Sequence, residues 1–395
     1  MTANQGNQAP IVIIGSGLSG YSLARELRKR DRDLPLMMIT ADDGASYSKP
    51  MLSTGFTKAK TADELAQAEA GAMADQLNME LRTHTRVTGI DPETHEVMIG
   101  NERLAYRKLV LAWGADVIRL PEAVSGCDRV CSINDLEDYR HFRKLVEGHR
   151  RVILLGAGLI GCEYANDLRN GGYEVTVVAP STQVMPGLLP EPAADAVRQA
   201  LEDEGVRFHL GVAAESVSEE TGQARGQLSD GAMLQGDVVV SAVGLRPRTG
   251  LAAAAGLAVG HGIHTDRWLA TSAPDVYALG DCAEVEGHVL MYVMPLMAGA
   301  RALAATLTGE PTPVKWGAMP VMVKTPCCPT AVCPPAESSD GHWDVQREGN
   351  SVKALYRDAR GGLLGFAVTG DYVIEKQALS KEVPPVLAPA PEVAG

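Results

Sequence analysis

The sequence lacks any run of 18 or more apolar residues, and its first ten residues are mostly polar with no apolar core. A membrane-spanning helix needs about 20 consecutive apolar residues, and a secretory signal needs a shorter apolar stretch behind a basic start. We therefore expect neither a transmembrane helix nor a secretory signal, and we expect the protein to be cytoplasmic.

An excess of basic residues is also missing. The chain has 36 Lys and Arg against 49 Asp and Glu, which gives a formal net charge of −13 at pH 7. Nucleic-acid-binding proteins usually carry a basic face, so this balance argues against that class of function. The same acidity would give no long-range attraction to an acidic protein partner.

Cysteines are few, and their number is odd. In a chain without a secretory signal an odd count indicates reduced thiols. Cys328 and Cys333 have a C-x4-C spacing but lie late in the chain, and we interpret them as buried or incidental thiols rather than as a redox pair; the sequence assigns no role to Cys327. Only His342 is close to them and no second cysteine pair follows, so we expect no metal site. The seven cysteines are Cys127, Cys131, Cys162, Cys282, Cys327, Cys328 and Cys333.

What the sequence does contain is a near-repeat. A short apolar run at Ile11–Ile14 is followed by glycines, a helical pattern and a second apolar run at Leu36–Ile39. The same order recurs about 140 residues later, with apolar runs at 152–155 and 175–178. A strand, a glycine turn, a helix and a strand within about 30 residues are typical of dinucleotide-binding folds. The sequence therefore predicts an α/β protein with two Rossmann-like domains.

The first glycine turn has the pattern G-x-G-x-x-G at Gly15, Gly17 and Gly20. The first glycine permits the tight turn, the second lets a pyrophosphate approach the backbone, and the third lets the helix pack on the strand. The helix N-terminus then offers free N–H groups to the phosphates. An acidic residue about 20 positions further on would bind the adenosine ribose, and Asp42 is better placed for this than Asp43.

The second turn repeats the pattern at Gly156, Gly158 and Gly161. At the end of its second strand stands Ala179, where NAD-binding domains often carry an acidic residue for the ribose. No arginine follows to bind a 2′-phosphate, so we expect NADH to be preferred over NADPH. The polar loop from Ser181 could bind the ribose in place of a carboxylate.

Further segments carry a family resemblance. Together with the two glycine turns, they resemble the FAD-dependent pyridine nucleotide-disulfide oxidoreductase superfamily, and within it the branch of ferredoxin reductases, rubredoxin reductases and NADH oxidases. The wider runs 39–56, 155–187 and 323–326 resemble the rubredoxin-reducing members. The segments read Y-S-K-P-M-L-S at 47–53, L-V-L-A-W-G-A at 109–115, S-A-V-G-L-R-P at 241–247, and T-S through Y-A-L-G-D-C-A at 271–283.

The resemblance implies a domain order. We expect a discontinuous FAD-binding domain of residues 1–115 and 245–314, and an NAD(H)-binding domain of residues 116–244. The composition changes from Pro311, with proline clusters and alternating strand-like runs, and a Pro/Ala-rich tail begins at Pro384. These changes predict a small α+β domain at 315–383 and then a disordered tail at 384–395.

The resemblance also implies residue roles. Asp281 would bind the ribityl hydroxyls of FAD, and Lys49 would lie near the flavin at the position of the family's arginine. Glu163 would help to place the nicotinamide, Lys324 would lie near the pyrimidine edge of the flavin, and Gly244 would contact a cofactor. Trp113 stands where the family usually has threonine, and either cofactor stacking or space filling would suit it.

These roles describe hydride transfer from NADH to FAD. We expect a helix from Pro295 to about Leu307 whose N-terminus, with Lys324, stabilises negative charge on the reduced flavin. We expect no general base. Disulfide reductases of the superfamily carry a C-x4-C pair after the first β-α-β unit, but residues 52–71 contain no cysteine. Electrons would therefore leave the flavin directly, one at a time.

The resulting interpretation is an NADH:rubredoxin reductase that supplies an alkane hydroxylase system, and we favour a monomer. Alternative acceptors are a ferredoxin or oxygen, and a non-catalytic NAD/FAD sensor is the alternative from another class. Rubredoxins are themselves acidic, so docking would use a local apolar or basic patch near the flavin and give a weak, transient complex. Met291, Met294 and Met297 recur every three residues, and we interpret them as core packing rather than as this patch.

Overall fold

The first apolar run forms the centre of a parallel sheet in the computed structural model, which describes residues 9–388. Its central strands are short runs of mostly β-branched or long aliphatic residues buried on both faces, while one edge strand, Glu80–Arg82, is partly exposed. Strands β1 and β2 pair in parallel with Ile11 opposite Leu36. The sheet runs in the order β21 (Val276–Ala278), β9 (Lys108–Leu111), β1 (Ile11–Ile14), β2 (Leu36–Ile39) and β5 (Glu80–Arg82).

Two long helices pack side by side on this first sheet, α1 (Leu18–Arg30) and α9 (Val293–Leu307). The helical pattern predicted after the first glycine turn corresponds to α1, whose apolar residues Leu23, Ala24 and Leu27 are buried. Helix α9 ends at the predicted residue but begins at Val293, so Pro295 lies in the first turn rather than at its first position. Proline is tolerated there because the first N–H groups of a helix have no intrahelical partner.

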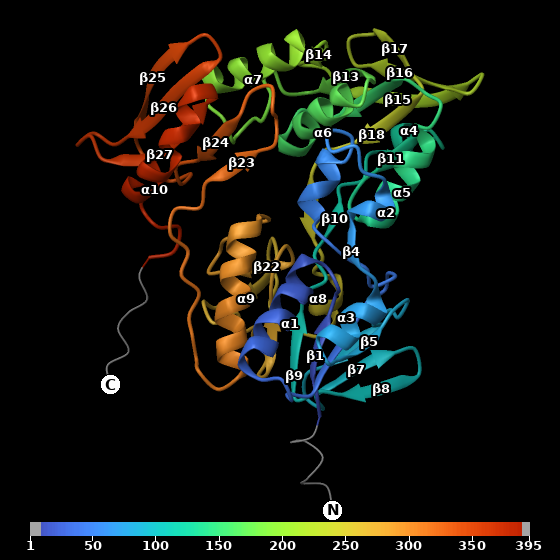
Figure 1. The fold of residues 1–395 in the computed structure, drawn as a ribbon, viewed down its shortest axis with the longest axis vertical. Coiled ribbons are helices and arrows are strands. Elements are labelled where there is room, and N and C mark those ends of the chain that lie inside the picture. Colours follow the sequence, from blue (N-terminus) through green and yellow to red (C-terminus); the bar gives the residue numbers. More distant parts are fainter. Residues whose placement is uncertain (1–8, 389–395) are drawn as a thin grey trace, which may run out of the picture.

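The second apolar pair forms an equivalent sheet in the upper part of the molecule (Figure 1), and the predicted repeat is confirmed at the level of topology. All of its strand pairs are parallel. Its helices include α5 (Leu136–Leu145), α6 (Leu159–Asn170) and α7 (Glu191–Asp203). The strand order is β11 (Val130–Ser132), β18 (Val238–Ser241), β12 (Arg151–Leu155), β13 (Glu174–Ala179) and β14 (Arg207–Leu210).

Each parallel sheet is accompanied by a small antiparallel sheet. We call the part of the chain built on the first parallel sheet the first unit, and the part built on the second parallel sheet the second unit. The first unit has β6 (Gly89–Asp91), β7 (Glu96–Ile99) and β8 (Glu102–Ala105). The second has β15 (Ala214–Glu220), β16 (Gln223–Leu228) and β17 (Met233–Gly236). The remaining short elements are α3 (Ala70–Gln76), α4 (Glu122–Ser125), α8 (Gly250–Ala254), β20 (Ile263–Thr265) and β22 (Ala283–Val285).

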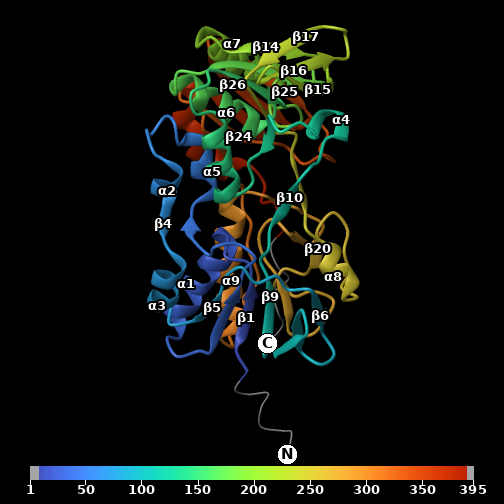
Figure 2. The same ribbon diagram turned by 90° about the vertical axis from the view of Figure 1, so that its right-hand side faces the viewer.

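Besides the chain that leads from α9 to the C-terminal sheet (Figure 1), two connections join the lower and upper parts (Figure 2). One is a two-stranded antiparallel ribbon of β10 (Ala115–Val117) and β19 (Leu245–Pro247). The other carries β3 (Ser46–Tyr47), the 3-10 helix η1 (Lys49–Thr54), α2 (Ala62–Leu65) and β4 (Ala66–Ala68), and it packs against α5 and α6. The segment that resembles Y-x-R-P-x-L-S therefore lies between the two dinucleotide-binding units.

The C-terminal part is a five-stranded antiparallel sheet with two short helices, the α+β arrangement expected from its sequence. Its hydrophobic residues join the core of the second unit, where α7 packs on β26 and β27. The strand order is β23 (Val321–Val323), β24 (Thr330–Cys333), β27 (Leu363–Thr369), β26 (Ser351–Arg357) and β25 (His342–Glu348), followed by η2 (Gly370–Glu375) and α10 (Lys376–Glu382).

The segment after α10 differs from the expected disordered tail at its first residues. Leu387 is buried, and its N–H donates to the carbonyl of Trp316 at 3.1 Å. Arg267 Nη1 donates to the carbonyl of Ala388 at 3.1 Å. The apolar side chains of Val386 and Leu387 pack against the hydrophobic core around the first sheet. Residues 389–395 lie outside the described residues. No helix within residues 9–388 is long and apolar enough to cross a lipid bilayer.

Candidate active site

The carboxyl ends of the two parallel sheets and the C-terminal sheet enclose one cleft of about 1780 Å³. Single ligand pockets usually measure roughly 300–1,000 Å³, so this cleft has room for more than one cofactor. In open α/β sheets, ligands bind at the carboxyl ends of the strands. The predicted site residues that line the cleft are Gly15, Gly17, Asp42, Lys49, Gly156, Gly158, Glu163, Gly244, Asp281 and Lys324.

The glycines of the first turn divide into packing and ligand-facing positions. Gly15 has φ +112°, and a Cβ there would lie 2.4 Å from the carbonyl oxygen of Ala112. A Cβ on Gly20 would lie 1.9 Å from the carbonyl oxygen of Gly15. A Cβ on Gly17 would meet nothing within 4 Å, because this residue faces the open cleft where α1 begins. The turn thus fits a pyrophosphate at Gly17, and Gly20 does not line the cleft but lets helix and strand pack.

The second turn has the same division of roles. A Cβ on Gly156 would lie 2.5 Å from the carbonyl oxygen of Ala242, and one on Gly161 would lie 2.0 Å from that of Gly156. Gly158 again faces open space at the start of α6. Both turns therefore have the backbone shape and free helix N–H groups that suit a dinucleotide, while Gly161, like Gly20, lies behind the cleft.

Asp42 follows β2, as the ribose-binding prediction requires. Its Oδ1 accepts hydrogen bonds from Ser16 Oγ at 2.9 Å, Thr40 Oγ1 at 2.6 Å and the N–H of Gly44 at 2.9 Å. No group within residues 9–388 donates to Oδ2. One oxygen thus fixes the carboxylate, and the other is available in the cleft for a hydroxyl donor.

Lys49 and Asp281 approach each other from η1 and the end of β21. Lys49 Nζ lies 4.0 Å from Asp281 Oδ2 and donates to Asn134 Oδ1 at 2.7 Å. Burial lowers the pKa of Lys49, and the Asp281 charge opposes this. Burial likewise raises the pKa of Asp281, opposed by Lys49. Within residues 9–388 the Asp281 carboxylate accepts no hydrogen bond and Lys49 Nζ donates only one, and both side chains line the cleft, so both can still hydrogen-bond a ligand.

Glu163 is fully buried on α6 and already uses both carboxylate oxygens. Oε2 accepts from Ser53 Oγ at 2.7 Å and pairs with Lys324 Nζ, while Oε1 accepts from the Lys324 N–H at 3.0 Å. The structure thus brings Glu163 and Lys324 together. Through Ser53 this pair also joins the η1 segment that carries Lys49.

The polar face of α6 continues this junction one turn further along the helix. Asn166 Oδ1 accepts from the N–H of Cys327 at 3.3 Å. Asp167 accepts from the N–H groups of Phe56 at 3.1 Å and Thr57 at 2.7 Å. Residues three and four apart lie on one helix face, so a single helix ties the η1 segment and the C-terminal domain to the second unit.

The N-terminus of α9 borders the same cleft, which Pro295 and Leu296 line. The prediction that the three methionines are core residues is wrong for Met294, which is 50% exposed and lines the cleft with Met291. Met297 lies one turn later and faces α1, where its sulfur accepts from Ser22 Oγ at 3.3 Å. Only Met294 and Met297 lie on α9, since Met291 precedes the helix, and of the three only Met297 is seen to contact α1.

The end of β13 contributes Ala179, Pro180 and Ser181 to the cleft, and the lining residues between 174 and 186 include no Arg or Lys. Ser181 Oγ donates to the carbonyl of Gln183 at 2.8 Å and accepts its N–H at 3.2 Å. The hydroxyl therefore fixes a tight turn. This surface offers no cation for a 2′-phosphate.

Trp113 and Arg248 close another wall of the cleft. Trp113 Nε1 donates to the carbonyl of Arg248 at 2.8 Å, and Arg248 Nη1 donates to the carbonyl of Trp113 at 2.7 Å. Arg248 Nε also bonds Asp116 Oδ1 at 2.6 Å. The indole thus fastens the strands that connect the two units, a role the resemblance did not indicate.

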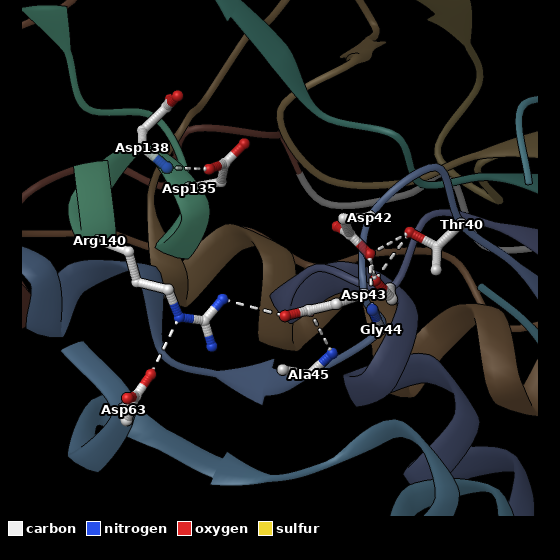
Figure 3. A network of polar contacts seen from close by, with 10 residues as sticks. Thr40, Asp42, Asp43, Gly44, Ala45, Asp63, Asp135, Asp138 and Arg140 are labelled. Atoms are coloured by element: carbon white, nitrogen blue, oxygen red, sulfur yellow. Dashed lines mark hydrogen bonds and ion pairs between the residues drawn. The ribbon is translucent and has the colours of Figure 1, made fainter. Parts of the chain in front are cut away.

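Several residues of the site carry no signal in the sequence. Asn134 holds Lys49 and donates through Nδ2 to the carbonyl of Ala115 at 2.9 Å. Arg140 on α5 reaches the loop that carries Asp42 and Asp43 (Figure 3). Only Ser53 could have been found, because it ends the Y-x-R-P-x-L-S segment. None of the seven cysteines lines the cleft, and all of them are free thiols.

Comparison with known proteins agrees with this geometry. Residues 9–304 match the family described as pyridine nucleotide-disulphide oxidoreductase, and residues 313–383 match the rubredoxin binding C-terminal domain. The rubredoxin-NAD(+) reductase of Alcanivorax borkumensis is 54% identical over 96% of this chain and 99% of that protein. The enzyme of the same name from Acinetobacter baylyi is 43% identical over 96% and 99%. Among solved structures, the ferredoxin reductase for the CYP199A2 system of Rhodopseudomonas palustris is 27% identical with a TM-score of 0.84, covering 95% of each chain.

Proposed function

The chain belongs to the pyridine nucleotide-disulphide oxidoreductase family and matches its rubredoxin-binding C-terminal domain, and from this premise we propose that it is an FAD-dependent NADH:rubredoxin reductase. One observation carries the proposal: two dinucleotide-binding turns and the C-terminal domain face a single cleft. Two relatives named rubredoxin-NAD(+) reductase support the choice of acceptor. The cleft has no cysteine, which favours direct transfer to a one-electron acceptor over a disulfide.

Each domain would have one binding role. Residues 1–115 and 245–314 would bind FAD, residues 116–244 would bind NADH, and residues 315–383 would dock rubredoxin. Gly17, Asp42, Lys49 and Asp281 would hold FAD, and Gly158 with the surface after β13 would hold NADH. Bound FAD would supply the chemistry, by accepting a hydride and releasing single electrons.

The chain's own residues would prepare the electrostatics of this site. The N-terminus of α9 places the positive end of its dipole at the cleft. Lys324 adds a full positive charge, and the buried carboxylate of Glu163 fixes where that charge lies. Glu163 would then act on the cofactors chiefly through Lys324, because its oxygens are already occupied. Charges fixed before the reaction stabilise developing negative charge without reorganisation.

Anaerobic stopped-flow with NADH tests the proposal. We expect rapid bleaching of the flavin absorbance, followed by its return when oxidised rubredoxin is mixed in. Bleaching without reoxidation by rubredoxin, but with reoxidation by a [2Fe–2S] ferredoxin, would assign a different acceptor. The absence of bleaching would leave a non-catalytic binding protein.

Coenzyme preference is tested in the same apparatus. The surface after β13 has no cation for a 2′-phosphate, so NADPH would bury that charge unpaired. We expect kcat/KM for NADH to exceed that for NADPH by about 100-fold or more. A preference for NADPH would show that residues outside this surface bind the adenosine ribose and its 2′-phosphate.

We also propose a cytoplasmic location and supply of electrons to an alkane hydroxylase. Cell fractionation would test the cytoplasmic location.

Growth experiments would test the supply of electrons to an alkane hydroxylase. We expect deletion of the gene to abolish growth on alkanes while leaving growth on carboxylic acids unchanged.

A further inference from the structure

The loop of residues 40–45 presents Asp42 to the cleft, and its own fixation is unusual because part of it comes from the other dinucleotide-binding unit. Asp43, beside Asp42, uses both carboxylate oxygens. Oδ1 accepts from the N–H of Ala45 at 2.9 Å, and Oδ2 accepts from Arg140 Nη1 at 3.0 Å. Figure 3 shows this guanidinium reaching the loop from α5.

The same guanidinium makes a second ion pair. Arg140 Nε donates to Asp63 Oδ1 on α2 at 3.1 Å, so Arg140 lies between two carboxylates (Figure 3). Asp63 is largely exposed, whereas Asp43 and Arg140 are each about two thirds covered. The Asp43 pair is therefore the better shielded of the two and the one expected to fix the guanidinium.

The surroundings of this pair are acidic. Burial raises the pKa of Glu137, and the charges of Asp135, Asp43 and Asp42 raise it further, in that order. These carboxylates therefore feel one another's charge. A cation at position 140 offsets this repulsion where Asp43 would otherwise be driven away from Asp42 and its other acidic neighbours.

We propose that Arg140 is a positioning residue for FAD. By holding Asp43 it keeps the loop in the shape that leaves Asp42 Oδ2 free for the adenosine ribose. The inference rests on the proposed function only in so far as the first glycine turn binds FAD. Arg140 would act on FAD affinity and not on electron transfer once FAD is bound, because the flavin-side groups Lys49 and Asp281 belong to other segments.

Titration of apoprotein with FAD, followed by flavin fluorescence, tests the inference. We expect Arg140→Gln to raise the dissociation constant for FAD by about 10-fold. We expect Asp43→Asn to do the same. In the double variant the two effects should not multiply, because each substitution removes the same interaction. Effects that multiplied, or an Arg140→Gln variant with unchanged FAD affinity, would overturn the inference.

Matched variants separate this role from general stability. Arg198 on α7 also pairs with two carboxylates, Asp195 at 3.8 Å and Glu202 at 3.6 Å, and Arg198→Gln should leave FAD affinity unchanged. Arg140→Lys keeps the charge and should restore most of the affinity if the Asp43 pair is what matters. If Arg140→Lys lost as much FAD affinity as Arg140→Gln, the charge pair with Asp43 would not be the interaction that matters. If Arg140→Gln does not fold, the FAD affinities of Asp43→Asn and Arg140→Lys, each compared with wild type, still test the inference.

The turnover number per bound flavin gives a second readout. For Arg140→Gln saturated with FAD, the rate of flavin reduction by NADH should equal that of wild type, and a reduced rate would contradict a role limited to FAD affinity. A wild-type protein that binds FAD but does not reduce rubredoxin would refute the proposed function alone. Normal rubredoxin reduction with unaltered FAD affinity in Arg140→Gln would refute this inference alone.

Discussion

At the scale of single residues, the buried carboxylate of Glu163 joins groups from three parts of the chain. Ser53 comes from the segment between the units, Glu163 from the second unit, and Lys324 from the C-terminal domain. Burying a charge is costly unless it is paired and hydrogen-bonded. Each contact therefore both satisfies the carboxylate and fixes the position of the residue that makes it.

Replacing Glu163 by glutamine tests this account. The amide has one acceptor in place of two, so either the Ser53 hydroxyl or the Lys324 N–H loses its partner. We expect the free energy of unfolding to fall by about 1–3 kcal/mol, and flavin reduction by NADH to slow because Lys324 is no longer fixed.

Urea denaturation and stopped-flow measure the two effects of Glu163→Gln. Ser53→Ala is the control, since it removes one hydrogen bond and leaves the Lys324 pair intact. It should cost about 1 kcal/mol with little change in the reduction rate. Equal kinetic effects in the two variants would show that Lys324 is not the group that matters.

Asp237, just before β18, provides a pH test away from the cleft. Burial acts to raise its pKa, but the Arg151 side chain at 2.8 Å and the N–H groups of Arg150 and Arg151 outweigh burial and lower the pKa from 3.8 to about 2. A carboxylate with a lowered folded pKa stabilises the protein above its unfolded pKa, and this contribution is lost as the pH falls through the folded pKa.

We therefore expect Asp237→Asn to lower the free energy of unfolding by about 2 kcal/mol at pH 7. The difference from wild type should shrink as the pH falls from about 5 to about 2. Urea unfolding at a series of pH values measures it. A difference that stayed constant over this range would mean that the ionised form of Asp237 is not what contributes.

At the scale of elements, the sequence predicts best where local pattern and tertiary environment agree. The sequence predicts strand β1 at its observed bounds, because four consecutive apolar residues before a glycine turn suit only a buried parallel strand. The start of α9 was misplaced by two residues, because proline is compatible with any position of the first turn.

Contacts between elements were beyond prediction for a physical reason. Asn134 and Arg140 owe their roles to partners some 85 and 97 residues away, and no periodicity encodes such pairs. Ser53 and Lys324 were recognisable only through family segments. The packing of residues 386 and 387 depends on a surface near Trp316 that exists only in the folded protein.

Helix α6 allows a test at this scale. Asp167 is buried and accepts the N–H groups of Phe56 and Thr57, which follow η1. Asp167→Ala would leave both donors without a partner, and each such donor costs about 1–3 kcal/mol. We expect a loss of about 2–4 kcal/mol in the free energy of unfolding, measured with urea.

Asn170, one turn later on α6, is the control for Asp167. Its exposed side chain donates to Thr57 Oγ1 at 2.9 Å, and water can replace that bond. Asn170→Ala should therefore cost less than about 1 kcal/mol. A comparable loss in both variants would mean that the helix, and not the buried carboxylate, accounts for the effect.

At the scale of the whole molecule, the net charge of −13 constrains how an acidic partner can dock. Long-range electrostatics would slow the encounter, so association must depend on local contacts. Exposed apolar side chains occur beside the cleft: Val293 and Met294 begin α9, and Met322 lies on β23 of the C-terminal domain. These three residues, which we call the apolar rim, all line the cleft, two from the first unit and one from the matched rubredoxin-binding domain.

Docking through the apolar rim predicts how the KM for rubredoxin depends on salt concentration. Because like charges repel, and salt screens repulsion while leaving apolar contact intact, the KM for rubredoxin should stay level or fall as salt is added. We expect Met294→Asp to raise this KM by about 10-fold, since it places a charge in an apolar contact that faces an acidic partner. Because position 294 lies in the first turn of α9, the added carboxylate should also slow flavin reduction by NADH, so this rate is followed separately and kept apart from the change in KM. Met233 on β17, 60% exposed at the far end of the second unit, provides the control, and Met233→Asp should leave the KM unchanged (Figure 1). Binding that tightened steeply as salt was removed would instead require a basic docking surface.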